Sequence, residues 1–252
     1  MDDEDLQLLI DLHKDAARQG PGSDAETARA LDLARIDRAA PLRVADIGCG
    51  TGASTLALAR LLPTAEITAV DVLPSFVEVL GARLARAGVA DRVTALCRSM
   101  DDLPFADEEY DLLWSEGAIY NMGFARGVEQ WRRYLRPGGV LAVSEITWTT
   151  ASRPPEVQTH WEAEYPEIDT AAAKLAVLER HGYAPIGYFV LPESCWEAHY
   201  YRPLRDRFAA FLARHAGSER ARAIVAAEET EMALYAQYGD CYGYGFYLAR
   251  RR

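Results

Sequence analysis

The sequence predicts a doubly wound α/β fold, and three observations carry that prediction. Between residues 42 and 150, short apolar segments bounded by Gly, Asp or Pro alternate with longer segments of helical periodicity. Strand–helix–strand repeats at this spacing join parallel strands through right-handed crossovers. A glycine-rich turn at residues 48–52 connects the first apolar segment to a helical pattern. The composition, 50% hydrophobic and 26% charged over 252 residues, is that of an ordinary globular protein.

Two helices are expected before the α/β core. Apolar side chains recur at helical spacing from Leu6 to Ala17, and the pattern stops at Gly20-Pro21-Gly22, where a helix cannot continue. Ser23 followed by Glu26 has the form of a capping box, which predicts the start of a second helix. We therefore expect residues 1–40 to form an N-terminal helical cap or lid.

The sequence of the core region predicts five strands and three helices. The expected strands cover residues 42–47, 65–70, 92–97, 110–114 and 140–146. The expected helices cover residues 54–62, 74–87 and 125–134. These elements make residues 41–150 the ligand-binding core of a domain that extends to residue 252.

Beyond residue 150 the pattern is less regular, but no change in composition marks a linker. We expect helices at residues 154–166, 170–181, 205–215 and 219–238, and strands at 187–191 and 242–248. Residues 151–252 are therefore expected to complete the sheet and to add segments on the substrate side.

The charge and the cysteines exclude several classes of protein. There are 27 Lys and Arg against 38 Asp and Glu, a net charge of −11, which disfavours nucleic acid as a partner. The four cysteines lie far apart without metal-ligand spacing, so we expect free thiols and no metal site. The acidic N-terminus lacks the form of a signal peptide, and no apolar run approaches the roughly 18 residues of a membrane span. We expect a cytoplasmic monomer or homodimer with a small-molecule partner.

The turn after the first strand carries the strongest functional signal. Its glycines, Gly48, Gly50 and Gly52, allow a tight turn and a close approach of ligand to backbone. A pyrophosphate site prefers GxGxxG, whereas this turn is GxGxG with Asp46 just before it. Asp46 disfavours a phosphate and suits S-adenosylmethionine, which has a sulfonium and an ammonium. Asp71, 25 residues later, can accept ribose hydroxyls, a feature that NAD-binding folds share.

The ordered motifs resemble those of the class I S-adenosylmethionine-dependent methyltransferases, in the broad group that includes ubiquinone and menaquinone methyltransferases. The motifs are DIGCGTG at 46–52, VDV at 70–72, SMDDLPF at 99–105, YDLLWSEGAIY at 110–120 and LRPGG at 135–139. The resemblance implies a Rossmann-like seven-stranded sheet in the order 3-2-1-4-5-7-6, with the last strand antiparallel. It also implies methyl transfer to a small-molecule acceptor.

The resemblance assigns the cofactor contacts to the loops that follow the first four strands. The implied contacts are Asp46, Gly48, Cys49, Gly50 and Gly52, then Asp71 and Val72, then Ser99, Met100 and Asp101, and finally Ser115. The third loop departs from the common form Gly-Asp-Ala-x-x-Leu-Pro-Phe, because Ser99 occupies the usual acid position. Our hypothesis is that Met100 packs on the adenine and that Asp101 or Ser99 accepts from its amine. Asp101 as a turn or capping residue is the alternative.

Two further segments have both a functional and a structural interpretation. Glu116 follows the fourth strand and either holds the cofactor ammonium or the substrate, or caps the next helix. The Asp/Asn-Pro-Pro-aromatic motif of nucleic-acid amino-methyltransferases is absent at this point. Residues 18–23 form either a lid, in which Gln19 and Gly20 contact the methionine part, or a plain turn between helices.

Methyl transfer needs little beyond positioning, because the sulfonium is already a strong electrophile. The candidates for a general base are His199, His160, Glu116 and Tyr120, and each histidine is alternatively a surface or core residue. Trp161 and Trp196 are expected in irregular segments over the crevice, where they form either a cage for a cationic or flat substrate or part of the core. An NAD-dependent oxidoreductase and a non-catalytic S-adenosylmethionine-binding protein are the alternative functions.

Overall fold

The computed structural model describes residues 2–252 and begins with two helices, α1 (Asp3–His13) and α2 (Asp24–Leu33). The Ser23 hydroxyl accepts from the Glu26 amide at 3.2 Å, so the expected cap of α2 is confirmed. α1 ends four residues before the expected Ala17. The His13 carbonyl accepts from the Ala16 amide and from the Gln19 side chain, contacts that turn the chain out of the helix.

One mixed sheet organises the fold and confirms the expected order. Its strands are β1 (Arg43–Ile47), β2 (Glu66–Asp71), β3 (Val93–Cys97), β4 (Tyr110–Glu116), β5 (Leu135–Trp148), β6 (Asp169–Thr170), β7 (Tyr183–Val190) and β8 (Tyr242–Arg251). The order is β3-β2-β1-β4-β5-β8-β7, and β8 runs antiparallel to both of its neighbours. The two-residue β6, which the sequence analysis did not predict, pairs with the end of β5.

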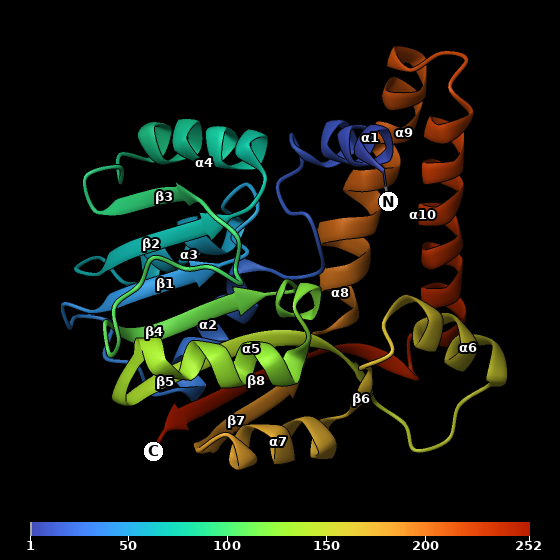
Figure 1. The fold of residues 1–252 in the computed structure, drawn as a ribbon. Coiled ribbons are helices and arrows are strands. Elements are labelled where there is room, and N and C mark those ends of the chain that lie inside the picture. Colours follow the sequence, from blue (N-terminus) through green and yellow to red (C-terminus); the bar gives the residue numbers. More distant parts are fainter. Residues whose placement is uncertain (1) are drawn as a thin grey trace.

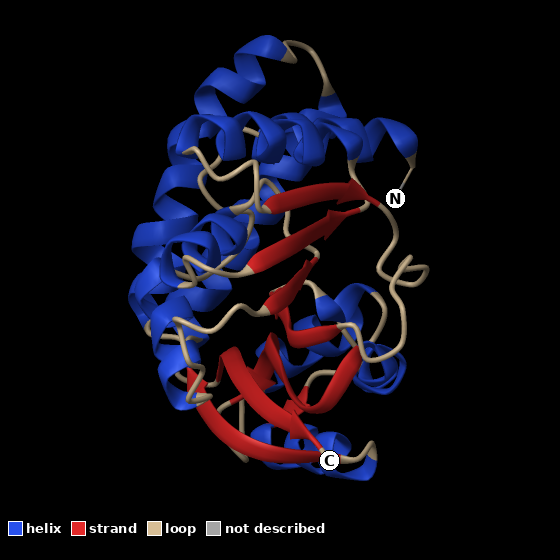
Figure 2. Ribbon diagram, turned by 90° about the vertical axis from the view of Figure 1, so that its left-hand side faces the viewer, coloured by secondary structure: helices blue, strands red, loops and turns tan. Residues whose placement is uncertain are grey.

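Helices cover both faces of the sheet (Figures 1 and 2). They are α3 (Ala53–Leu61), α4 (Pro74–Ala87), α5 (Phe124–Trp131), α6 (Pro155–Glu164), α7 (Ala171–Arg180), α8 (Glu193–Trp196), α9 (Arg202–Arg214) and α10 (Glu219–Tyr238). Helices α2, α3 and α4 pack on one face, and α5 and α7 pack on the other. The two faces follow from strand alternation, since successive side chains point to opposite sides.

The core is accordingly split by the sheet. Val44 and its neighbour Leu112 are buried on the face of α3, whereas the next pair, Ala45 and Leu113, is buried on the face of α5. All four side chains have no exposed surface. Because one-residue shifts would move these side chains to the wrong face, the pattern fixes the strand register.

A group of helices lies beyond the carboxyl ends of the parallel strands, formed by α1, α6, α8, α9 and α10 (Figure 1). α1 packs against α9 and α10, so the first helix and the tail cover the strand ends together. Trp196 was expected in an irregular segment, but it lies in α8 and is 1% exposed. Its ring stacks on Tyr235 at 4.4 Å between ring centroids, which makes it a core residue. Trp161 likewise lies in a helix, α6.

The domain boundary at residue 40 stays a prediction. Over residues 2–252, no helix combines the length and the apolarity that crossing a membrane requires.

Candidate active site

A cavity of about 440 Å³ lies at the carboxyl ends of β1 to β4, the edge where open α/β sheets bind ligands. The loops after these four strands and the segment 18–21 line it. Ten of the predicted cofactor residues lie on its wall: Gln19, Gly20, Gly48, Cys49, Gly50, Asp71, Val72, Ser99, Met100 and Asp101. Glu116 and Tyr120 line it as well. We call this space the first cavity.

The glycines of the first loop are required by the protein's own packing. Gly48 and Gly50 have φ values of 75° and 55°, in a backbone region that residues other than glycine rarely adopt. A Cβ on Gly48 would lie 2.3 Å from the Ala118 Cβ, and one on Gly50 would lie 2.5 Å from the Gln19 Oε1. The expected reason was a close approach of ligand to backbone; the structure adds the close approach of neighbouring protein segments.

Asp71 ends β2 and presents a carboxylate to the first cavity. Its Oδ2 accepts from the Gly50 amide at 2.8 Å, and its Oδ1 accepts from the Leu73 amide at 3.0 Å. These bonds fix the orientation of the carboxylate and leave each oxygen a second lone pair for a ligand hydroxyl. The adjacent Val72 side chain is 59% exposed, an apolar surface on the cavity wall.

Three of the expected cofactor residues, Asp46, Gly52 and Ser115, do not line this cavity, and their contacts with a cofactor stay predictions. Asp46 is completely buried, and its Oδ2 accepts from the hydroxyls of Ser54 at 2.7 Å and Thr55 at 2.6 Å. Strand alternation turns its side chain toward α3, so Asp46 holds the start of α3 against β1. Its other oxygen has no hydrogen-bond partner within residues 2–252, and burial raises the pKa of this carboxyl to about 7. Ser115 is buried within β4.

Asp46→Asn should remove a pH dependence of stability. The raised pKa, about 7 against 3.8 for an ordinary carboxyl, means that the folded chain binds more protons than the unfolded chain between these values. The free energy of unfolding therefore falls as pH rises through this window. Urea titrations should show the variant gaining about 2–3 kcal/mol relative to the parent between pH 5 and pH 8, at about 1.4 kcal/mol per pKa unit. Parallel pH curves for the two proteins would contradict this prediction.

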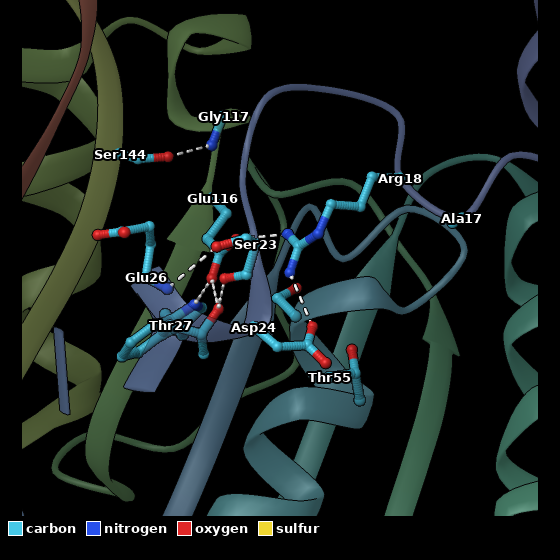
Figure 3. Close-up of polar contacts among 12 residues, drawn as sticks. Ala17, Arg18, Ser23, Asp24, Glu26, Thr27, Thr55, Glu116, Gly117 and Ser144 are labelled. Carbon is cyan, nitrogen blue, oxygen red and sulfur yellow. Dashed lines mark hydrogen bonds and ion pairs between the residues drawn. The ribbon is translucent and has the colours of Figure 1, made fainter. Parts of the chain in front are cut away.

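Glu116 is the centre of a polar network at the end of β4 (Figure 3). Its Oε2 accepts from the Arg18 guanidinium at 2.9 Å, and its Oε1 accepts from the Thr27 hydroxyl at 2.6 Å. The Trp114 indole also donates to Oε1, at 3.0 Å. Arg18 pairs in addition with Asp24 at 3.2 Å. Glu116 therefore joins the segment before α2, and α2 itself, to the sheet while it faces the first cavity.

The segment between α1 and α2 is fixed to the glycine loop through Gln19. The Gln19 Oε1 accepts from the Thr51 amide at 3.0 Å, and its Nε2 donates to the His13 carbonyl at 3.2 Å. These bonds occupy the side-chain amide of Gln19, which was expected to contact the methionine part of the cofactor. Arg18, which the sequence analysis did not single out, lines the first cavity instead. The sequence indicates Arg18 only indirectly. Glu116 is a carboxylate at a strand end and needs a cation nearby, but the sequence does not say which one.

The third loop gives Asp101 contacts within the protein. Its backbone amide donates to the Ser99 hydroxyl at 3.2 Å, and its carboxylate pairs with Arg126 at 2.7 Å. Met100 is half-buried on the cavity wall, and its carbonyl accepts from the Trp131 indole at 3.2 Å. These contacts support the alternative interpretation, in which Asp101 is a turn residue.

A second cavity of about 510 Å³ adjoins the first, and both are lined by Gln19, Gly20, Pro21, Gly117 and Tyr120. His160 lines the second cavity.

His199 lines neither cavity, and its role as a base stays a prediction. The helical turn from Glu197 to Tyr201 buries Tyr201 and leaves His199 exposed. Within residues 2–252, no group of three His, Cys, Asp or Glu side chains has the spacing of a metal site.

Comparison with known proteins shows that this chain is similar to methyltransferases. The family profile described as a methyltransferase domain matches residues 44–139. The malonyl-acyl-carrier-protein O-methyltransferase of Dechloromonas aromatica is 34% identical over 111 residues, covering 42% of this chain and 37% of that protein. The ubiquinone/menaquinone C-methyltransferase UbiE of Geotalea daltonii is 28% identical, covering 47% and 52%. The chain spans between a quarter and about half of the length of the curated relatives it matches.

Solved structures match almost the whole chain. A methyltransferase from Geobacter sulfurreducens, solved with S-adenosylhomocysteine, has a TM-score of 0.84 at 21% identity and covers 98% of each chain. The cyclase SpnF has a TM-score of 0.77, also at 21% identity, covering 98% of this chain and 92% of its own. At such identities the likeness shows the fold, and SpnF shows that the fold also supports other chemistry.

Proposed function

We propose that the first cavity binds S-adenosylmethionine and that its methyl group is transferred to a small molecule. The proposal is supported by the fold that the chain shares with solved methyltransferases and by the match of residues 44–139 to a methyltransferase-domain family. The observation that carries the proposal is the arrangement of Asp71. A fixed carboxylate with free lone pairs stands at the end of β2, one hydrogen bond from the glycine loop. This arrangement suits the two hydroxyls of a ribose.

The residues present fit the rest of the cofactor. Val72 and Met100 offer apolar surface for the adenine, and the Ser99 hydroxyl lies in the same loop. At the other end of the cavity, Arg18 and Glu116 present opposite charges from one wall. A methionine moiety carries a carboxylate and an ammonium, so it matches this pair of charges.

When bound, the cofactor supplies an activated methyl group on a sulfonium. The chain then has to position an acceptor and exclude water. The segment 18–21, held by Gln19 and Glu116, lines the cavity and is placed to serve the second purpose. Tyr120 stands where the two cavities meet and is placed to contact both cofactor and acceptor. The cytoplasmic location and the oligomeric state expected from the sequence stay predictions.

Thermal unfolding with candidate cofactors tests the proposal. S-adenosylhomocysteine at 100 times its Kd should stabilise the chain by about 2.7 kcal/mol, which raises Tm by roughly 5–10 °C for a chain of this size. NAD⁺ at the same concentration should leave Tm unchanged, because the GxGxG turn lacks the GxGxxG pattern of a pyrophosphate site. A shift with NAD⁺ and none with S-adenosylhomocysteine would overturn the proposal in favour of an oxidoreductase.

A further inference from the structure

The second cavity has a wall of aromatic rings. Parts of α6, α8, α10 and β8 form it, together with the segment 19–21. The aromatic residues on its wall are Tyr120, Trp161, Tyr165, Trp196, Tyr200 and Tyr244. The rings of Trp196 and Tyr244 are stacked, with 5.2 Å between their centroids. Aromatic faces carry partial negative charge, so such a wall attracts flat groups and cations.

The charged side chains of the second cavity are carboxylates. Glu164, Glu228 and Glu231 line it, and within residues 2–252 no lysine or arginine does. The buried Lys174 Nζ lies over the Tyr165 ring, 5.2 Å from its centroid, and is paired with Glu145 at 3.1 Å. Its charge is therefore compensated by its own partner.

Two of these carboxylates are only partly satisfied by the protein. The Glu231 Oε1 accepts from the Tyr201 hydroxyl at 2.8 Å, and the Glu228 Oε1 contacts the His13 ring at 3.3 Å. The Glu228 Oε2 is buried and has no hydrogen-bond partner among the described residues. Burial, and then the charge of Glu228, raise the pKa of Glu231 to about 7. A buried carboxylate without a partner is costly, and a cationic ligand would compensate it.

We propose that the second cavity binds the methyl acceptor and that this acceptor is a small amine with an apolar or aromatic body. The inference rests on the proposed function, because the cavity adjoins the first cavity at Gly117 and Tyr120. An anionic acceptor would meet three carboxylates and, among the described residues, no lysine or arginine; His160 is the one basic side chain on the wall. An amine instead places its ammonium among carboxylates and its body among the rings.

The transfer balances with the groups present. The bound ammonium gives one proton to a carboxylate oxygen of Glu231, which frees the nitrogen lone pair. The carbon–nitrogen bond forms as the carbon–sulfur bond breaks, and the electron pair of that bond stays on sulfur. The products are an N-methylammonium and a thioether, and Glu231 returns its proton to water. A carboxyl with a pKa near 7 is suited to take and return a proton at neutral pH.

The test compares ligands that differ only in the polar group. The full chain, saturated with S-adenosylhomocysteine, is titrated calorimetrically with benzylamine, 2-phenylethylamine and tryptamine, and with the alcohol and carboxylate of each skeleton. At least one amine should bind about tenfold or more tightly than both of its partners. The same amine should yield an N-methyl product, seen by mass spectrometry, when S-adenosylmethionine replaces the product cofactor.

Variants of α10 assign the preference to the cavity. Combining Glu228→Gln with Glu231→Gln should abolish the tenfold preference for the amine and leave S-adenosylhomocysteine affinity unchanged, which also reports that the variant is folded. Glu229→Gln removes one negative charge at an exposed position of the same helix and should keep the preference. If the parent binds S-adenosylhomocysteine but prefers no amine, or if the double variant keeps the preference, this inference is wrong. Failure to bind S-adenosylhomocysteine would instead contradict the proposed function.

Discussion

Glu116→Ala should lower the free energy of unfolding by about 3–5 kcal/mol, the usual cost of removing one partner from a buried ion pair. The side chains of Arg18 and Glu116 are 10% and 9% exposed. The substitution leaves the guanidinium with Asp24 as its remaining partner. It also removes the nearer of the two acceptors of the Thr27 hydroxyl and the acceptor of the Trp114 indole. Urea unfolding at neutral pH measures the loss directly.

Two comparisons separate the buried charge from a general loss of packing. Adding Arg18→Met to Glu116→Leu removes both charges, so the double variant should recover much of the stability that Glu116→Ala loses. Asp107→Ala breaks the exposed pair with Arg133 and should cost less than about 1 kcal/mol. If Glu116→Ala lowers the free energy of unfolding by no more than Asp107→Ala does, the network of Figure 3 does not hold the segment before α2.

The strands and helices that form the sheet could be predicted because local patterns specify them. Gly, Asp or Pro lies at or near an end of each apolar segment between residues 42 and 146, and the order of the strands was implied by the resemblance to the class I methyltransferases. The ends were less accessible, because pairing extends the strands. β5 begins at Leu135, five residues early, since Leu135 pairs with Tyr110. β6 exists only as a partner for the end of β5, a contact with no local signature.

The same distinction applies to the site. Asp71 and Met100 follow parallel strands whose carboxyl ends share one edge; the alternation of strands and helices placed Asp71 there, and the resemblance to the methyltransferases placed Met100. The direction in which a side chain points at a strand end was harder to predict, and Asp46 turned out to face α3. The second cavity depends on how α6, α8 and α10 pack over the strand ends, a long-range arrangement that periodicity does not encode. Arg18 was missed for a related reason, since its partner Glu116 is 98 residues away.

Asp71→Ala should weaken S-adenosylhomocysteine binding by at least about 100-fold. Hydrogen bonds to a charged group contribute about 1.5–3 kcal/mol each, and a ribose offers two hydroxyls, so a loss of about 3 kcal/mol is a low expectation. The alanine also releases the amides of Gly50 and Leu73, which lets the glycine loop move away from β2. Isothermal titration with S-adenosylhomocysteine measures the change, and Tm without ligand reports whether the fold is kept.

Two further variants distinguish the loss of direct contacts between Asp71 and the ribose from the loss of one negative charge. Asp71→Asn keeps an oxygen that can accept from one of the two amides and from one hydroxyl, so it should weaken binding by about tenfold, at 1.4 kcal/mol per factor of ten. Asp102→Ala removes the same charge from an exposed position in the third loop, outside the first cavity, and should leave the affinity nearly unchanged because exposed charges are screened by salt. Equal affinities for Asp71→Ala and Asp102→Ala would mean that the ribose does not lie at the end of β2, and the position of the cofactor in the first cavity would have to be reconsidered.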